Sequence, residues 1–407
     1  MLPEQLQTSP YLTCVRPGEP SPVVYVTDTL GPQYPDLSEP GDARFGVVGL
    51  DRKVVWQHDP RVLTALQNAA RDPLPTAELA ARFGAPLITK LVDQSWLQDP
   101  TKLCVDYQLY SGEIEVTAHC NWGCLFCPVS KDPKPRETMP MSLFTEIVTK
   151  LADHGQANYV TFHFFNEPTL DRLFVQRIEV LREYDMKLAL FTNGSALTPD
   201  KIKLLMSSGV LYHLIINLPT LHRDEFETLT GARTYAQSLR NLDQAIDAGA
   251  FPIGLVVNGL GPQRERNLAE LRERYEPRGV TVDPTQHSDR AGTLRGKFDE
   301  KVRVDGRLTG CNWPVNHAYY SVRGDMFLCC NDYYQREVFG HVGDGSVHEV
   351  MTSPAAVETR RRVFGVSNAS EDYPCRSCHD QCLDFPHRQF RPMATFPLES
   401  VDGGAQW

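Results

Sequence analysis

Three cysteines in an eight-residue run constrain this chain more than any other feature. The run reads Cys120-Asn-Trp-Gly-Cys124-Leu-Phe-Cys127, and its spacing can direct three thiolates into one site. A four-iron cluster held by three thiolates keeps one iron without a protein ligand, and that iron can bind and reduce a substrate or cofactor. A zinc site is the alternative, but zinc usually takes four ligands, and the nearby candidate for a fourth is His119.

Predicted strands and helices alternate through the segment that carries these cysteines. A strand over 112–119 leads into Cys120, and a helix over 141–154 ends at Gly155. Further strands are predicted over 159–165, 188–191, 211–217, 252–258 and 280–282, with helices over 198–209, 235–249 and 267–275. This order predicts an α/β fold with a parallel sheet, and in such sheets the chemistry lies where the strands end. Polar residues that occupy such ends are Glu167, Asn193, Asn217 and Asn258.

The cysteine motif and the element order together resemble the radical S-adenosylmethionine (SAM) superfamily. The family motif CxxxCxφC is matched by Cys120, Cys124, Phe126 and Cys127. The triplet Thr192-Asn193-Gly194 matches a TNG that often follows the third strand of the family. Asn166-Glu167-Pro168 stands where the family has Gly-Gly-Glu, so this chain keeps the acidic residue and lacks both glycines. The resemblance covers residues 113–291.

This resemblance implies a fold, a cofactor set and a reaction. It implies a partial (β/α)6 barrel over 106–295, with a SAM-binding [4Fe-4S] cluster on Cys120, Cys124 and Cys127. Glu167 is then expected to bind the SAM ammonium group, and Phe126 to lie against the adenine. The other expected SAM contacts are Asn166, Asn193, Asn217 and Asn258. The reduced cluster would cleave SAM to a 5′-deoxyadenosyl radical that takes hydrogen from a substrate, with a flavodoxin or ferredoxin as electron donor.

The C-terminal part, 296–407, holds a second set of cysteines. Cys311, Gly324, Cys329 and a Cys375-Arg-Ser-Cys378 pair follow the pattern of the SPASM and shorter twitch extensions of radical SAM enzymes. Full SPASM tails hold two clusters and need more cysteines, so we expect one auxiliary [4Fe-4S] cluster on Cys311, Cys329, Cys375 and Cys378. Cys330 and Cys382 lie nearby, and Cys382 is a possible competing ligand. A zinc site built from the same cysteines is the alternative.

The N-terminal part divides at about residue 43. Residues 1–43 are rich in Pro, Ser, Asp and Thr, which predicts an irregular arm. Residues 44–105 predict two short strands over 45–50 and 53–56 and then three helices, a pattern typical of a winged helix. This domain resembles the PqqD-like element of peptide-modifying enzymes, where a leader peptide adds a strand to the small sheet. The alternatives are a structural cap without a ligand and a DNA-reading winged helix.

Composition limits the remaining classes. The formal net charge of −10 argues against a nucleic-acid partner, and no run reaches the length of a membrane span. The N-terminus lacks a secretion signal, and eleven cysteines in such a chain indicate metal binding rather than disulfides. We therefore expect a cytoplasmic protein without a membrane partner.

Two enzyme functions and one other function fit these motifs. The first is a peptide maturase that oxidises or crosslinks a ribosomally made precursor peptide with a leader, favoured by the N-terminal pattern. The second is a small-molecule dehydrogenase of natural-product biosynthesis, favoured by the single auxiliary cluster. The third is an iron–sulfur electron-transfer protein, which Glu167 and the TNG triplet disfavour because a carrier needs no SAM site.

A few other residues carry weaker expectations. His163 and His213 lie in apolar strands and are expected in the core or lining it, and Arg360-Arg361-Arg362 is expected on a solvated helix face. Arg290 follows the last predicted strand and can approach substrate or the SAM carboxylate. Cys14 and Cys104 are expected to be ordinary buried or free thiols.

Overall fold

One large sheet forms the centre of the protein. The structure is a computed structural model that describes residues 2–15, 24–25, 44–50, 53–249, 252–259, 261–285, 289–294, 306, 308 and 310–378. Its nine-stranded sheet has the order β13-β12-β11-β10-β9-β8-β14-β15-β16. The strands are β8 (Ser111–Ile114), β9 (Tyr159–Thr161), β10 (Lys187–Thr192), β11 (Leu211–Asn217), β12 (Ile253–Val257), β13 (Thr281–Pro284), β14 (His317–Tyr320), β15 (Asp325–Phe327) and β16 (Val338–His341).

The row from β8 to β13 is parallel, as the sequence predicts. β14 joins the same sheet in parallel with β8, and β15 and β16 then add antiparallel strands. The α/β class and the parallel sheet are therefore confirmed. The sheet continues into the C-terminal part, which the sequence pattern does not predict.

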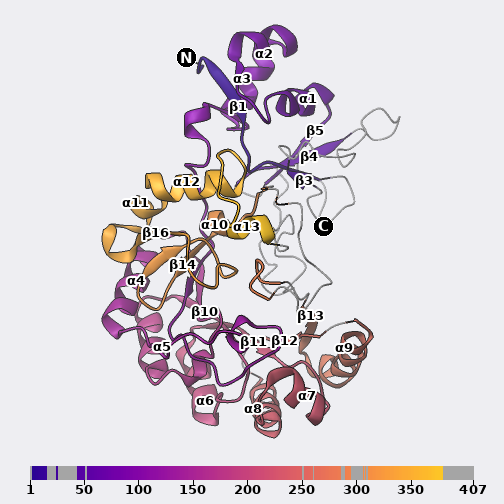
Figure 1. Ribbon diagram of the computed structural model, residues 1–407, viewed down its shortest axis with the longest axis vertical. Helices are drawn as coiled ribbons and strands as arrows, with labels where there is room; N and C mark the ends of the chain where they lie inside the picture. The colour runs from indigo at the N-terminus through magenta and orange to yellow at the C-terminus, as the bar shows by residue number, and fades with distance from the viewer. Residues whose placement is uncertain are drawn as a thin grey trace.

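Helices cover the outer face of the parallel strands. They are α4 (Met141–His154), α5 (Phe174–Glu183), α6 (Pro199–Ser208), α7 (Arg223–Thr230), α8 (Tyr235–Ala248) and α9 (Gly261–Tyr275), and they run around the curved row of strands (Figure 1). α6 shows how local sequence sets such a helix, because Thr198 caps its start, Pro199 follows and Gly209 ends it. α5 and α7 were not predicted, and α9 begins six residues earlier than the predicted 267.

The two faces of the sheet differ in polarity. On β8, Gly112 faces α4 and leaves room for the side chain of Leu151, while Ile114 joins the same apolar core. Because side chains alternate along a strand, Ser111 and Glu113 lie on the opposite, inner face. Thr161 on β9 and His213 on β11 also lie on this inner face and are buried polar residues. The inner face therefore has a polar character that a purely structural core lacks.

Two predicted strands are shorter than expected. The strand predicted over 112–119 ends at Ile114, because the carbonyl group of Val116 accepts hydrogen bonds from Met139 N and from Arg177 instead of pairing with a neighbouring strand. The strand predicted over 159–165 ends at Thr161. There the side chain of Asn166 accepts from Phe164 N at 3.1 Å, so the chain turns before it reaches Glu167.

The N-terminal domain has two small sheets and three helices. A four-stranded sheet has the order β3-β2-β4-β5, and a three-stranded sheet has the order β6-β1-β7. Its elements are β1 (Gln5–Thr8), β2 (Thr13–Val15), β3 (Val24–Tyr25), β4 (Phe45–Val48), β5 (Val54–Gln57), α1 (Pro60–Asn68), β6 (Leu74–Pro75), α2 (Thr76–Phe83), α3 (Ala85–Asp93) and β7 (Leu97–Gln98). The two strands and three helices predicted over 44–105 are present.

The prediction of an irregular arm over residues 1–43 is wrong for the part that the structure describes. β1 is the central strand of one sheet, and β2 pairs with β4 in the other. Leu6, Leu12 and Cys14 are buried in the same core as α1 and α3. The arm forms strands because its short apolar stretches find partners far along the chain, which local composition does not reveal.

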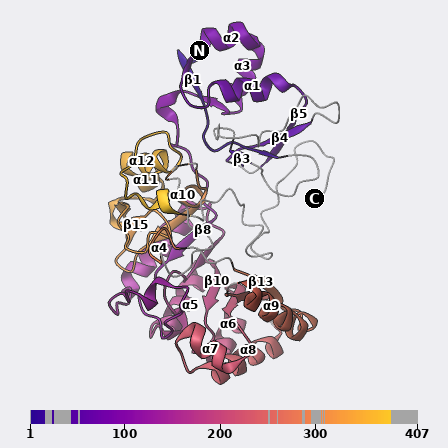
Figure 2. The same cartoon turned by 45° about the vertical axis from the view of Figure 1, so that its right-hand side comes forward.

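The C-terminal part lies between the N-terminal domain and the helices of the large sheet, in both views (Figures 1 and 2). Its helices are α10 (Trp313–Asn316), α11 (Val347–Met351), α12 (Pro354–Val363) and α13 (Pro374–Ser377). Arg360 on α12 is buried and donates to Cys104 O at 2.9 Å and Met351 O at 2.8 Å, and Arg361 donates to Pro100 O. The expectation of a solvated face is therefore wrong for Arg360, which together with Arg361 holds the link that leaves the N-terminal domain, whereas Arg362 is 37% exposed and pairs with Glu358. None of the helices in the described ranges combines the length and apolarity needed to span a bilayer.

Candidate iron–sulfur and SAM site

The three motif cysteines lie on a loop between β8 and α4 that is held by its backbone. Gly123 N donates to Thr230 O and Leu125 N donates to Leu229 O, both at 2.9 Å, so the loop docks on the end of α7. The ring of Trp122 packs edge-on against Phe226 of α7, and its Nε1 donates to Thr234 Oγ1 at 2.9 Å. α7, which the sequence pattern missed, is thus the platform for the loop.

The three thiol groups lie close enough to interact electrostatically. Burial, together with the nearby charges of Glu167 and Cys127, raises the pKa of the Cys120 thiol to about 12. Burial also raises the pKa of Cys124 well above its usual range, with contributions from Cys127 and Cys120. The pKa of Cys127 is raised by burial and lowered in part by the Arg290 guanidinium. Thiols buried this close together become thiolates only when cations lie beside them. A bound iron cluster supplies such cations.

Among the described residues, no three His, Cys, Asp or Glu side chains lie close enough to hold a single metal ion. A four-iron cluster asks for a different arrangement, because each thiolate binds its own iron. Trp122 N donates to Cys120 Sγ at 3.4 Å, a hydrogen bond of the kind that tunes cluster potential.

Glu167 lies beside this loop as a buried carboxylate. Its Oε1 accepts from Thr192 Oγ1 at 2.6 Å and from the backbone and hydroxyl of Thr169, and its Oε2 accepts from Asn193 N at 2.6 Å. Burial raises the pKa of Glu167, and these hydrogen bonds act in the opposite direction. Its own N–H donates to His119 O at 2.8 Å, which ties the end of β9 to the cysteine loop. A bound ammonium group would share or replace one of the donors that the carboxylate already has.

Asn193 contacts Cys120, one of the expected cluster ligands. Its Nδ2 donates to Asn121 Oδ1 at 2.9 Å and lies 3.9 Å from Cys120 Sγ, while its Oδ1 accepts from Ser195 N at 2.9 Å and from Ser195 Oγ at 2.6 Å. These contacts with other protein groups satisfy both the donor and the acceptor of the Asn193 side-chain amide. The structure therefore brings the TNG triplet to the cysteine loop, and the side chain of Asn193 orders that loop.

The other predicted SAM residues fall into three places. Asn217 and Asn258 meet at the ends of β11 and β12, where Asn258 Nδ2 donates to Asn217 Oδ1 at 2.7 Å. Phe126 is buried in the same apolar cluster as Cys124, against which Cys120 and Cys127 pack. Asn166 Nδ2 is buried and has no hydrogen-bond partner among the described residues.

The second cysteine set also converges. The pKa of Cys329 is raised well above its usual range by burial, with contributions from Cys330, Cys375, Cys378 and Cys311. Cys311, Cys329 and Cys375 belong to one buried cluster with Tyr319 and Phe327, and Cys378 is buried beside them. The predicted auxiliary ligands thus lie together, with Cys330 close to them. Cys382 lies outside the described residues.

One arginine lies between the two cysteine sets. Arg290 interacts electrostatically with Cys127, and its Nη1 donates to Asn331 Oδ1 at 3.4 Å. Asn331 Nδ2 in turn donates to Cys378 Sγ at 3.4 Å. Arg290 thus connects the segments of the two cysteine sets, and its approach to substrate or to the SAM carboxylate stays a prediction.

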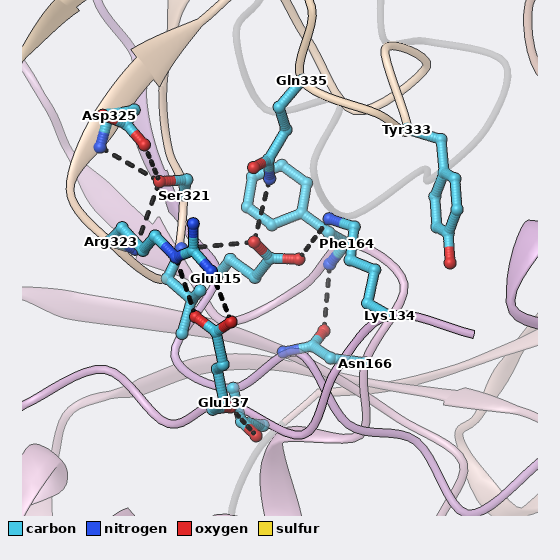
Figure 3. Close-up of polar contacts among 12 residues, drawn as sticks. Glu115, Lys134, Glu137, Phe164, Asn166, Ser321, Arg323, Asp325, Tyr333 and Gln335 are labelled. Carbon is cyan, nitrogen blue, oxygen red and sulfur yellow. Dashed lines mark hydrogen bonds and ion pairs between the residues drawn. The ribbon is translucent and has the colours of Figure 1, made fainter. Parts of the chain in front are cut away.

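Figure 3 shows how the large sheet is fastened to the C-terminal part. Glu115 is 1% exposed, and it accepts from Lys134 Nζ at 2.7 Å, from Gln335 Nε2 at 2.9 Å and from Val322 N at 3.2 Å. Lys134 follows the cysteine loop, whereas Gln335 and Val322 belong to the part that carries the auxiliary cysteines. One buried carboxylate therefore joins the segments of both cysteine sets, and no sequence motif marks it.

Comparison with known proteins agrees with this architecture. Residues 114–275 match the model of the radical SAM superfamily, and residues 311–382 match the model of SPASM, an iron–sulfur cluster-binding domain. The chain thus contains a radical SAM domain followed by a SPASM domain, and it is a radical SAM enzyme. The radical SAM domain implies a four-iron cluster and SAM as cofactors, and the SPASM domain implies auxiliary iron–sulfur clusters. These matches favour iron over zinc for both cysteine sets.

Individual relatives are distant. An S-adenosyl-L-methionine-dependent 2-deoxy-scyllo-inosamine dehydrogenase from Niallia circulans is 22% identical over 273 residues, 66% of this chain and 92% of that protein. A probable GTP 3′,8-cyclase from Saccharolobus islandicus is 27% identical over 163 residues, 39% of this chain, and the match spans about half (52%) of the cyclase. The structure of Streptococcus suis SuiB bound to the precursor peptide SuiA aligns over 92% of this chain and 93% of that chain, with 12% identity and a TM-score of 0.52. That likeness concerns the fold.

Proposed function

We propose that this radical SAM enzyme oxidises or crosslinks a ribosomally made precursor peptide, with its N-terminal domain as the leader-binding element. The observation that carries the proposal is the pair of buried cysteine sets, whose segments are joined by the hydrogen bonds of Glu115 and by Arg290. Cys120, Cys124 and Cys127 hold the SAM-binding cluster, and Cys311, Cys329, Cys375 and Cys378 hold one auxiliary [4Fe-4S] cluster. When bound, the first cluster supplies the electron that cleaves SAM into methionine and the radical that removes hydrogen from the substrate.

In this scheme the protein's own residues bind SAM, order the cysteine loop and exclude water. Glu167 balances the charge of the SAM ammonium group, and the free donor of Asn166 offers a further hydrogen bond to SAM. Asn193 orders the loop of Cys120, and Asn217 with Asn258 forms a polar edge at the strand ends. Phe126 excludes water beside the adenine, because its ring is buried within the cysteine loop.

The N-terminal domain supports a peptide substrate. β5 pairs with β4 and has no second strand neighbour among the described residues, so an extended peptide can add to its edge. The likeness to SuiB, solved with a precursor peptide, covers more of this chain than residues 106–407 contain, and so it includes N-terminal residues. A winged-helix leader element over 44–105, with the partial barrel after it, is the arrangement we propose.

A small-molecule dehydrogenase is the second candidate. It is favoured by the sequence relation to 2-deoxy-scyllo-inosamine dehydrogenase, which extends over 92% of that protein. An N-terminal domain without a ligand would then act as a structural cap.

Iron content and SAM cleavage test the core of the proposal. Anaerobically reconstituted protein is expected to bind about eight irons per chain, four for each cluster. Replacing Cys120, Cys124 and Cys127 together by Ala should leave about four irons and abolish SAM cleavage. Cys375→Ala should leave SAM cleavage partly intact and stop product formation, whereas Cys14→Ala, a buried thiol outside both sets, is the matched control. Tightly bound zinc without iron would overturn the proposal.

Hydrogen exchange separates the two substrates. A ribosomally made precursor peptide with its leader should bind the full-length protein and slow amide exchange in β5, because a new strand protects that edge. Turnover of 2-deoxy-scyllo-inosamine without peptide binding would instead establish the second candidate. Deleting residues 1–105 is a poor test, because Tyr11, Leu103 and Cys104 are buried in the same cluster as Cys311 and Cys329.

A further inference from the structure

A carboxylate and two histidines form a cluster on the inner face of the sheet that the proposed function does not yet use. Glu113 on β8 is opposite Thr161 of β9 on one side and Tyr319 of β14 on the other. His317 on β14 lies opposite Ser111 in the same register. His163 follows β9 two residues after Thr161, so its side chain belongs to the same face. The topology thus brings three distant segments of the chain to one point.

Glu113 is held as an ion by its neighbours. Its Oε1 accepts from Ser111 Oγ at 2.6 Å and lies 3.6 Å from His317 Nδ1. Its Oε2 accepts from Thr161 Oγ1, and it lies 3.2 Å from His163 Nδ1. Burial alone would raise the pKa of Glu113, but His163, His317 and Ser111 outweigh it and lower the pKa to about 2. A carboxylate that is ionised at neutral pH can only accept, so Nδ1 of His163 carries a hydrogen.

That hydrogen bond defines the other nitrogen of His163. In the neutral ring only one nitrogen carries a hydrogen, so Nε2 is the acceptor. Among the described residues Nε2 has no hydrogen-bond partner, and the side chain is 31% exposed. The ring is stacked with Phe191, centroids 4.4 Å apart, and with Phe164, centroids 5.7 Å apart. The imidazole is stacked between aromatic rings, a carboxylate orients it, and its Nε2 is free. This is the arrangement of a general base.

The location of this base matters as much as its geometry. Four residues after His163 comes Glu167, which contacts the cysteine loop through His119 O. On the other side, Phe164 lies against Tyr319, at 5.8 Å between centroids, and Phe327, at 5.6 Å. The hydroxyl of Tyr319 interacts electrostatically with Cys330, Glu113, Cys329 and Cys311. His163 therefore lies between the SAM site and the auxiliary cysteines.

We propose that His163, oriented by Glu113, is the catalytic base that takes the proton which the substrate releases during its oxidation. The proposal rests on the proposed function. In total the substrate gives up one hydrogen atom to the SAM-derived radical, one electron to the auxiliary iron–sulfur cluster and one proton to Nε2 of His163. The hydrogen atom leaves from carbon, and the proton leaves from the oxygen, nitrogen or carbon that forms the new double or crosslinking bond. The substrate class is thus one whose radical carries an acidic hydrogen next to the reacting carbon. Glu113 is a positioning residue that balances the imidazolium charge.

The first test needs no turnover. Purified iron-loaded protein is treated with diethyl pyrocarbonate near neutral pH, and the modified histidines are mapped by mass spectrometry. His163 should react through its free Nε2, whereas His213, which is 1% exposed, should not. An unreactive His163 in the folded protein would mean that Nε2 is not available to a substrate, and the proposal would be wrong.

The second test uses His163→Gln and Glu113→Gln in the full-length enzyme, with whichever of a precursor peptide and 2-deoxy-scyllo-inosamine the wild-type enzyme converts. Product should fall about 100-fold in His163→Gln, the usual contribution of a general base, while 5′-deoxyadenosine still forms. Added imidazole should restore part of the product in His163→Ala, which a structural role would not give. His222→Gln, at an exposed histidine, is the control.

The outcomes distinguish this inference from the proposed function. Wild-type protein that cleaves no SAM would overturn the proposed function and the inference together. SAM cleavage with product formation at the wild-type rate in His163→Gln would overturn the inference alone. Equal loss of 5′-deoxyadenosine and product in His163→Gln, without imidazole rescue, would assign His163 to structure and also overturn it.

Discussion

Glu167 is a carboxylate whose oxygens accept hydrogen bonds from Thr169, Thr192 and Asn193 in a buried site. Replacing it by Gln keeps the size of the side chain and removes its charge. We expect the affinity for SAM to fall about tenfold or more, because a charge-assisted contact contributes upwards of about 1.4 kcal/mol. Equilibrium dialysis with labelled SAM measures this, with Glu179→Gln on the surface of α5 as control. Unchanged affinity would show that Glu167 only orders the two strand ends.

His213 is a residue whose titration opposes folding. It is buried on the inner face of β11, its Nε2 has no hydrogen-bond partner among the described residues, and burial lowers its pKa from 6.5 to about 4. Below pH 6.5 the unfolded chain binds a proton here that the folded chain does not, so stability is lost as the pH falls from 6.5 towards 4.

The size of that loss can be measured by substitution. At pH 5 the free energy of unfolding is lower by about 2 kcal/mol because of this one histidine. His213→Gln should therefore reduce the drop in thermal midpoint between pH 7 and pH 5 relative to the wild-type protein. An identical drop in both proteins would contradict a neutral, buried imidazole at this position.

At the scale of elements, α7 supports the cysteine loop through a close backbone approach. Gly231 ends α7 with φ +64°, and a Cβ atom there would lie 3.2 Å from the carbonyl oxygen of Gly123. Gly249 ends α8 with the same φ, and a Cβ atom there would meet nothing within 4 Å. The two glycines are thus matched in backbone conformation and differ in the contact with the loop.

This pair isolates the role of the loop contact. Both Gly231→Ala and Gly249→Ala carry the cost of a left-handed residue, about 1–2 kcal/mol. Gly231→Ala alone should displace the segment next to Cys124, and we expect it to lower the iron content and the rate of SAM cleavage. Iron analysis and 5′-deoxyadenosine formation check this. Equal effects of both variants would mean that α7 does not position the cluster.

At the scale of the whole molecule, Arg360 fastens the N-terminal domain to the SPASM domain. It donates to the carbonyl groups of Cys104, Val105 and Met351 from a buried position. Arg360→Met should free the linker, at a cost of about 2 kcal/mol for lost hydrogen bonds to a charged group. Amide exchange in 100–105 should then accelerate about 30-fold. Arg362→Met, at an arginine that is 37% exposed and paired with Glu358, is the control and should change little.

Much of the site follows from residues that are close in sequence. The cysteine triplet, the acidic residue after β9 and the TNG triplet after β10 were found because each is a local pattern at the end of a predicted strand. The auxiliary cysteines followed from spacing as well, and the structure brings them together. Parallel strands align their ends at one edge of a sheet, so local patterns at strand ends become neighbours without further information.

Only the tertiary structure determines which partners the isolated polar residues have. Glu113, Glu115, His163 and Arg360 carry no motif, and the sequence pattern either gave no role to them or assigned them to a core or a solvated face. Their roles depend on which carbonyl, lysine or histidine arrives from segments as much as 256 positions away in sequence. The sequence by itself determined the chemistry of the sulfur ligands and the alternation of the parallel sheet, because both are periodic and local. The buried charges and the strands of the N-terminal arm were settled by long-range pairing, since a polar group is stable inside a protein only where distant residues satisfy it.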